Sequence, residues 1–177
     1  AGAKTAEHLR DQGFDGSVTL VGEESLPPYE RPPLSKGVLM GSADAESAFV
    51  HPEQWYADNA VDLVLGSQVA GVDLDSHTVT LNDREIPFTK LALTTGARPR
   101  RLEVPGSDLP GIHYLRELPD AERLRQVFDE VGRIVVVGAG WIGLEVAAAA
   151  RQAGVDVTVV EAAELPLLAV LGPQMAE

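Results

Sequence analysis

Three glycines are spaced so that they could bind a dinucleotide. The sequence GAGWIG places Gly138, Gly140 and Gly143 directly after residues 134–137, an apolar run rich in β-branched side chains. Gly138 allows a tight turn, Gly140 lets a pyrophosphate approach the backbone, and Gly143 lets a helix pack closely on a strand. The helix that follows would direct unpaired N–H groups toward the phosphates. These residue types and their spacing predict a nucleotide-binding turn.

The acid beyond this turn predicts which dinucleotide binds. Glu161 follows residues 156–160 and lies about 20 residues after the turn, as the dinucleotide fingerprint requires. Its carboxylate can accept hydrogen bonds from both ribose hydroxyls but would repel a 2′-phosphate. Ala162 and Ala163 supply no arginine to offset that repulsion. We therefore predict NAD rather than NADP; the alternative is a strand–helix–strand unit that binds nothing.

A strand, a helix and a second strand must hold these residues in place. The expected elements are strands at residues 134–137 and 156–160 and a helix at residues 144–153, ended by Gly154 as a C-cap. Upstream, residues 118–130 have the apolar periodicity of an amphipathic helix. We place a domain boundary just before this helix, which divides the chain into residues 1–117 and 118–177.

The first residues repeat the spacing of the fingerprint helix. Gly2 and Gly13 are as far apart as Gly143 and Gly154, and a short apolar segment and an acid, Glu23, follow them. We interpret Gly2 as the third glycine of a first fingerprint whose strand and first two glycines are missing. An ordinary helix–strand pair is the alternative.

Two further segments of the N-terminal part have recognisable patterns. Residues 69–88 alternate in the manner of a small antiparallel meander. Residues 91–94 read as a buried strand that ends at the turn Thr95-Gly96-Ala97, and α/β sheets bind ligands at the carboxyl ends of such strands.

A proline-rich segment carries charged residues. The prolines within residues 27–33 forbid a helix or a central strand there and stiffen a loop that bears Arg31 and Lys36. A solvated loop is the alternative. Arg98, Arg100 and Arg101 form the densest basic cluster, which is either a binding surface or another solvated loop.

Composition argues against several classes of function. The net charge of −13, from 14 basic and 27 acidic residues, disfavours general binding to nucleic acid or anionic membranes. The absence of cysteine removes disulfides, thiolate metal sites and a redox-active dithiol from this stretch, and we predict no metal. Because no segment is long and apolar enough to span a bilayer and no leader is seen, we expect a cytoplasmic protein.

Together these motifs resemble the FAD-dependent NADH:ferredoxin reductases of the putidaredoxin and rubredoxin reductase type, in the pyridine nucleotide-disulfide oxidoreductase superfamily. The resemblance rests on residues 2–10 with 18–23, YERPPLSK at 29–36, LALTTGARPR at 91–100 and GAGWIGLE at 138–145. It covers nearly the whole chain and implies an internal fragment of a longer protein. The implied fold is α/β, with two incomplete Rossmann-like, three-layer units: an FAD domain with a β meander at 1–117 and the first part of an NAD domain at 118–177.

The resemblance also assigns roles to residues. Glu23 would bind the adenosine ribose of FAD, and Lys36 would lie near flavin N5, where an ammonium stabilises the electron density that hydride delivers. Glu145 would face the nicotinamide and pair with Lys36, so these two residues are the catalytic candidates; the alternative for Glu145 is an exposed acid favoured by the helix dipole. The further expected cofactor contacts are Gly2, Arg31, Val69, Thr95, Gly96, Ala97, Arg116, Gly138, Gly140, Trp141, Ile142, Gly143 and Glu161. Trp141 stands where many relatives carry tyrosine.

The implied reaction passes hydride from NADH to FAD and then single electrons to a small ferredoxin-like iron–sulfur protein. Since such partners are usually acidic, Arg98, Arg100 and Arg101 are candidates for a docking patch. Two alternatives remain: a flavin and NADH domain that serves another acceptor, as in nitrite reductases, or an inactive, cofactor-free fragment. The lack of cysteine argues against a dithiol-using disulfide reductase. The sequence does not indicate the oligomeric state.

Overall fold

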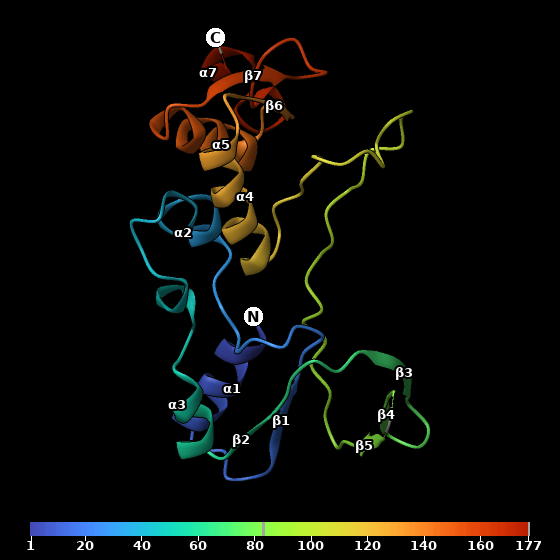
Figure 1. The fold of residues 1–177 in the computed structure, drawn as a ribbon. Coiled ribbons are helices and arrows are strands. Elements are labelled where there is room, and N and C mark those ends of the chain that lie inside the picture. The colour runs from blue at the N-terminus through green and yellow to red at the C-terminus, as the bar shows by residue number, and fades with distance from the viewer. Residues whose placement is uncertain (83, 177) are drawn as a thin grey trace. The chain divides into compact units, whose positions relative to one another are not determined.

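The computed structural model describes residues 1–82 and 84–176, which form two compact units (Figure 1). Unit 1 comprises residues 1–29 and 49–97, and unit 2 comprises residues 30–48 and 98 onward. The chain is a mixed α/β protein with small sheets, as predicted. The structure groups residues 30–48 with the C-terminal part, whereas our two domains divide the chain once, before residue 118. The division into nucleotide-binding domains stays a prediction.

Unit 1 holds a parallel strand pair and a separate antiparallel meander. Its elements are α1 (Gly2–Asp11), β1 (Val18–Val21), α3 (Glu53–Asp58), β2 (Val61–Val64), β3 (Val69–Asp73), β4 (Thr78–Leu81) and β5 (Glu85–Pro87). β1 pairs with β2 in parallel, and the meander has the order β3-β4-β5. The core beside the parallel pair consists of Ala3, Ala6, Tyr56 and Val61. The predicted antiparallel meander is confirmed. Burial alternates along β4 and β5, but not along β3, where Val69 and Val72 are both exposed.

The prediction of a buried strand at residues 91–94 is wrong. These residues have no regular secondary structure, and the side chains of Leu91 and Leu93 are 38% and 72% exposed. An apolar run becomes a strand only when a neighbouring strand takes its backbone hydrogen bonds. Within the described residues, β1 pairs with β2 alone.

Unit 2 is built around one parallel strand pair and the helices against it. Its elements are the 3-10 helices η1 (Pro32–Ser35) and η2 (Ala45–Ala48), the helices α2 (Gly37–Met40), α4 (Leu118–Glu130), α5 (Trp141–Gln152), α6 (Leu168–Leu171) and α7 (Pro173–Ala176), and the strands β6 (Arg133–Val137) and β7 (Asp156–Val160). Strands β6 and β7 pair in register from Arg133 with Asp156 to Val137 with Val160. The structure confirms the predicted strand–helix–strand order, although α5 begins at Trp141 rather than at residue 144.

Only one face of this strand pair is covered within the described residues. The core side holds Ile134, Val136 and Val157, which pack on a cluster formed by Leu39, Leu124, Phe128, Val146, Ala149, Ala150 and Val155. On the opposite face Val135 and Val137 are each 59% exposed. The described part of unit 2 therefore has one sheet layer and one helical layer.

The proline-bearing part of the segment, residues 27–33, is more regular than predicted. We expected its prolines to forbid a helix, but Pro32 and Pro33 occupy the first positions of η1. A proline costs little there because the first N–H groups of a helix have no partner within it. α2 follows and ends at Met40, and its C-cap is Gly41, which has φ 68°. Leu39 on α2 is fully buried and fixes the segment in the core of unit 2.

The close contact between α5 and β6 depends on Gly143. A Cβ atom at this position would lie 2.1 Å from the carbonyl oxygen of Gly138, a backbone atom that cannot yield without moving the turn. At Gly140 a Cβ atom would meet nothing within 4 Å. The two glycines therefore differ in what they do: Gly143 permits packing, and Gly140 leaves open space.

We predict that Gly143→Ala lowers the free energy of unfolding by about 2–3 kcal/mol, because the helix must move away from the turn. Gly140→Ala is the matched control and should cost about 1 kcal/mol or less, the cost of a poorer N-cap. Urea unfolding monitored by circular dichroism measures both. Equal losses in the two variants would contradict this account of the contact.

Candidate active site

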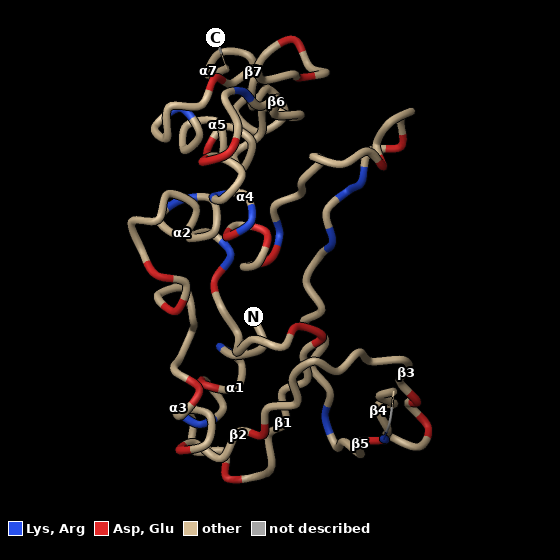
Figure 2. The backbone as a smooth tube through the Cα atoms, in the orientation of Figure 1, with Lys and Arg blue, Asp and Glu red and all other residues tan. Residues whose placement is uncertain are grey.

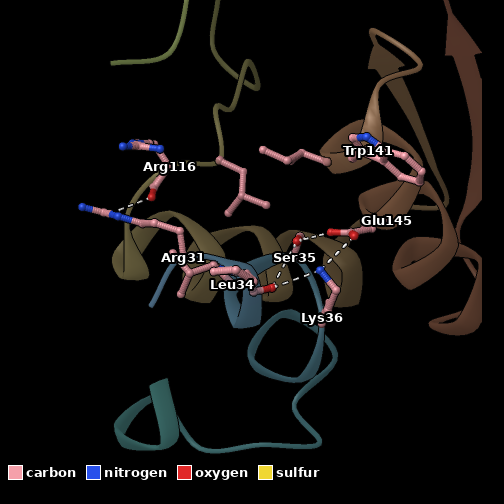
Figure 3. A pocket seen from close by; sticks show the side chains of 10 residues that line it. Arg31, Leu34, Ser35, Lys36, Arg116, Trp141 and Glu145 are labelled. Carbon is pink, nitrogen blue, oxygen red and sulfur yellow. Dashed lines mark hydrogen bonds and ion pairs between the residues drawn. The ribbon is translucent and has the colours of Figure 1, made fainter. Parts of the chain in front are cut away.

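A cavity of about 240 Å³ lies in unit 2 (Figure 3). Residues from η1 and its flanks, from the segment before α4 and from the start of α5 line it. They are Arg31, Pro32, Leu34, Ser35, Lys36, Leu115, Arg116, Trp141, Ile142 and Glu145. The structure thus brings together six of the predicted site residues: Arg31, Lys36, Arg116, Trp141, Ile142 and Glu145.

The two ends of the cavity differ in chemistry. At one end, Arg31 donates from Nη1 to the carbonyl oxygen of Arg116 at 2.8 Å, so the arginine side chain is held against the segment before α4 (Figure 3). At the other end lie Lys36 and Glu145. Between them the lining is mostly apolar, and Trp141 is 54% exposed. An apolar lining with charged groups at its ends suits a flat aromatic ligand that carries an anionic group.

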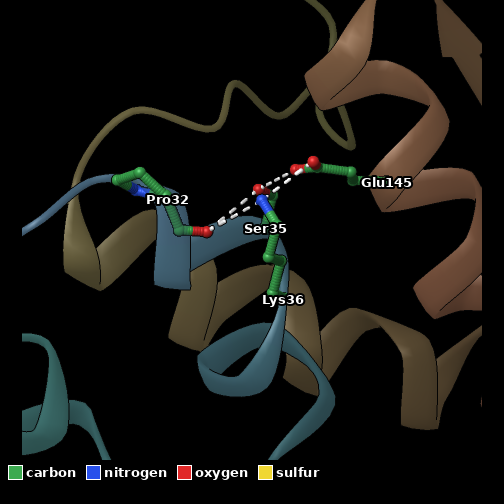
Figure 4. A network of polar contacts seen from close by, with 4 residues as sticks. All are labelled: Pro32, Ser35, Lys36 and Glu145. Atoms are coloured by element: carbon green, nitrogen blue, oxygen red, sulfur yellow. Dashed lines mark hydrogen bonds and ion pairs between the residues drawn. The ribbon is translucent and has the colours of Figure 1, made fainter.

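Lys36 and Glu145 form an ion pair. The Lys36 Nζ lies 2.8 Å from Glu145 Oε1, and the side chains are 51% and 30% exposed. The Ser35 hydroxyl donates to Glu145 Oε2 (Figure 4). The hydrogen bond from Lys36, and after it the one from Ser35, lowers the pKa of Glu145. Glu145 is therefore ionised near neutral pH, and the predicted pairing is present; the catalytic roles of both residues stay predictions.

The glycine turn leaves room for a phosphate group. Gly138 has φ 103°, a backbone conformation that residues other than glycine rarely adopt. Its N–H donates to the carbonyl oxygen of Val160 at 2.8 Å. A Cβ atom at either Gly138 or Gly140 would point into open space. Gly140 is also the N-cap of α5, so the helix N-terminus begins at the turn. These residues fit a dinucleotide pyrophosphate.

The Glu161 carboxylate is held beside the same turn. Its Oε1 accepts the N–H of Ala163 at 2.9 Å, and its Oε2 accepts the N–H of Ala139 at 2.6 Å. These backbone hydrogen bonds, that of Ala163 first, lower the pKa of Glu161. The exposed carboxylate keeps further lone pairs with which it can accept ribose hydroxyls.

The remaining predicted contacts lie in unit 1. Gly2 begins α1, and a Cβ atom there would lie 2.9 Å from Thr94 Oγ1 and 3.3 Å from Leu20 Cδ1, so this glycine, like Gly143, permits close packing. Glu23 is exposed after β1, and Val69 at the start of β3 is 43% exposed. Thr95, Gly96 and Ala97 lie in an exposed irregular segment in which Gly96 has φ 70°. Their roles as cofactor contacts stay predictions.

Sequence reasoning missed Ser35. At 6% exposure it is the one buried polar residue of the described chain. The serine stands within the quoted motif, but nothing local indicated that it would be buried, because its partner Glu145 is 110 positions away. Leu34 and Leu115, which supply apolar lining of the cavity, were also not predicted as site residues.

Two other kinds of feature are absent from the described residues. Across residues 1–82 and 84–176, no three His, Asp or Glu side chains are grouped so that they could hold a metal ion. No described helix is both long and apolar enough to cross a membrane.

Comparison with known proteins adds independent findings. A family model described as pyridine nucleotide-disulphide oxidoreductase matches residues 1–177. Rhodocoxin reductase of Rhodococcus erythropolis is 48% identical over 177 residues, which are 99% of this chain and 42% of that protein. Rubredoxin-NAD(+) reductase of Pseudomonas putida is 43% identical over 178 residues, 99% of this chain and 46% of that protein. The chain therefore spans less than half the length of these relatives.

Solved structures are also similar. A ferredoxin reductase from Rhodopseudomonas palustris matches with a TM-score of 0.94 and 38% identity, over 99% of this chain and 43% of that chain. The reductase in a covalent putidaredoxin reductase–putidaredoxin complex matches with a TM-score of 0.91 and 38% identity, over 98% of this chain and 43% of that chain.

The lowered pKa of Glu145 leads to a prediction about acid stability. A carboxylate whose pKa is depressed by folding stabilises the protein above its ordinary pKa of 4.5, and that contribution is lost as the pH falls through the lowered value. Glu145→Gln should therefore reduce the free energy of unfolding by about 0.2–1 kcal/mol at neutral pH, and the difference from wild type should shrink below the ordinary pKa.

Urea unfolding of the wild type and of Glu145→Gln, from neutral pH to below the ordinary pKa of 4.5, measures the difference in their free energies of unfolding. Glu164→Gln, an equal change of charge at an exposed residue, is the control for the change in net charge. A difference between wild type and Glu145→Gln that grew toward acid pH would refute the assignment.

Proposed function

Because this chain belongs to the pyridine nucleotide-disulphide oxidoreductase family, we propose that it forms the flavin- and NADH-binding part of a reductase that passes electrons from NADH through FAD to a ferredoxin-like iron–sulfur protein. The names of the relatives, rhodocoxin reductase and rubredoxin-NAD(+) reductase among them, support this choice of acceptor. One observation carries the proposal: the N-terminus of α5 starts at the glycine turn, and Glu145 on the same helix forms the ion pair at the cavity.

The glycine turn would hold NADH. Open space at Gly138 and Gly140 admits the pyrophosphate, and the start of α5 presents N–H groups to it. Glu161 is ionised and fixed beside the turn, so it would accept the ribose hydroxyls and repel a 2′-phosphate. We propose NADH rather than NADPH on this basis.

The cavity would hold the flavin. FAD, when bound, supplies the conversion from two-electron to one-electron transfer that an iron–sulfur acceptor requires. Arg31 and Arg116 would bind it at one end, and Trp141 and Ile142 would cover its apolar surface and exclude water. Lys36 places a positive charge at the other end, and Glu145 keeps that charge oriented. Gly2, Glu23, Val69 and Thr95–Ala97 are proposed as the FAD contacts of unit 1. A cytoplasmic location is part of the proposal, since NADH is a cytoplasmic reductant.

Anaerobic titration of the intact natural protein with NADH tests the proposal. We expect the visible flavin absorbance to bleach with NADH at far lower concentrations than with NADPH. Glu161→Ala should raise the half-saturating NADH concentration at least about tenfold, because hydrogen bonds to a charged acceptor are lost. Glu164→Gln should leave it unchanged. Flavin that NADH does not reduce, or equal use of NADH and NADPH, would refute the proposal.

A basic segment is our candidate for docking an acidic acceptor. Arg98, Arg100 and Arg101 lie on an exposed stretch without regular secondary structure, in a chain with 14 basic and 27 acidic residues. Figure 2 colours basic positions blue and acidic positions red along the backbone. The Arg101 guanidinium lies 4.8 Å from the centre of the Tyr114 ring, and the Tyr114 hydroxyl accepts the N–H of Leu102 at 3.0 Å. These contacts keep part of the segment in place.

Substitution of all three arginines by glutamate should lower kcat/KM for the iron–sulfur acceptor about tenfold or more at low ionic strength. The reason is that the basic segment would no longer attract the acidic acceptor electrostatically. Flavin reduction by NADH should not change. The matched control reverses three exposed basic residues elsewhere, Arg84, Lys90 and Arg133. Steady-state assays at low and high salt measure both, and identical behaviour of the two triple variants would rule out the patch.

A further inference from the structure

We infer that Ser35 is a positioning residue: its hydroxyl fixes the orientation of the Glu145 carboxylate and thereby holds the Lys36 ammonium at the cavity (Figure 4). The consequence for catalysis rests on the proposed function. The contact itself rests on geometry alone, and the two can be tested separately.

The two oxygens of Glu145 have different donors. Lys36 Nζ lies 2.8 Å from Oε1, and the Ser35 hydroxyl donates to Oε2. Both donors also lie 3.4 Å from the carbonyl oxygen of Pro32, a longer and weaker contact. A hydroxyl has a single hydrogen to donate, and a carboxylate is a stronger acceptor than a carbonyl. With both oxygens engaged, the carboxylate cannot rotate without breaking one of these contacts.

Burial explains why the serine, rather than the ion pair, sets the geometry. Lys36 and Glu145 are 51% and 30% exposed, and exposed ion pairs between long side chains are held weakly in water. Ser35 is 6% exposed and lies at the end of η1, next to the buried Leu34. Its short side chain loses little freedom when it binds. It therefore presents a fixed donor to which the carboxylate adjusts, and Lys36 follows the carboxylate.

This arrangement predicts which quantities Ser35 affects. The hydrogen bonds given for the Ser35 hydroxyl go to Glu145 and Pro32 rather than to the glycine turn, so its loss should have little effect on NADH binding. Its loss should leave Glu145 free to rotate and Lys36 less often in place, which slows flavin reduction. It should also raise the pKa of Glu145 toward its ordinary value, because a hydrogen bond to the charged form is removed.

The test compares Ser35→Ala with Ser35→Thr, which keeps the hydroxyl, in the intact flavin-containing protein. Ser47→Ala is the matched control, since its hydroxyl donates to a backbone carbonyl oxygen outside the cavity, that of Asp44. One readout is the titration of the Glu145 side-chain carboxyl by ¹³C NMR, and the other is anaerobic stopped-flow reduction of the flavin by NADH.

We expect Ser35→Ala to raise the pKa of Glu145 and to lower the limiting rate of reduction about tenfold, with the half-saturating NADH concentration within about twofold of wild type. Ser35→Thr should keep the pKa of Glu145 and the limiting rate of reduction near their wild-type values. If threonine does not fit and this variant does not fold, the Glu145 titration and the reduction rate of Ser35→Ala decide whether Ser35 is a positioning residue. An unchanged Glu145 titration would overturn the contact, and a changed titration with an unchanged rate would overturn the positioning role. If NADH does not reduce the wild-type flavin, the proposed function fails, and the titration still decides whether Ser35 holds the carboxylate.

Discussion

The ion pair between Lys36 and Glu145 ties residues 30–48 to α5, and the site of unit 2 depends on that connection. A pair this exposed contributes only about 0.2–1 kcal/mol to stability. The stability of the arrangement comes instead from Leu39, whose complete burial in the core of unit 2 contributes about 1.5–3 kcal/mol. The apolar anchor brings the segment to the helix, and the charged contact, with Ser35, determines how its side chains point.

Helix α5 serves both halves of the proposed site. Gly143 lets it lie close against β6 and the glycine turn, so its N-terminus begins at the turn. Glu145 is on the same helix, close to that N-terminus, and faces the cavity. A single rigid element therefore relates the predicted dinucleotide turn to the Lys36 ammonium, which is what hydride transfer between two stacked cofactors would require.

Local patterns predicted the parts of the structure that local physics determines. The helix at residues 118–130 and the strand at residues 156–160 have the predicted bounds, because apolar periodicity and β-branched side chains act within each segment. Features that depend on distant neighbours could not be predicted in this way. Among the described residues, no strand pairs with residues 91–94, although their apolar pattern predicted a strand. Pro32 and Pro33 fit the first turn of a 3-10 helix, and Ser35 is buried against a residue far along the chain.

The two members of the ion pair, Lys36 and Glu145, should act together on electron transfer from NADH. A double-mutant cycle measures this most directly, with Lys36→Met, Glu145→Gln and the double variant compared by the limiting rate constant for flavin reduction in stopped-flow experiments. If the two residues act as one unit, the double variant should be no slower than the slower single variant. Losses that multiply in the double variant would show instead that the two residues act independently.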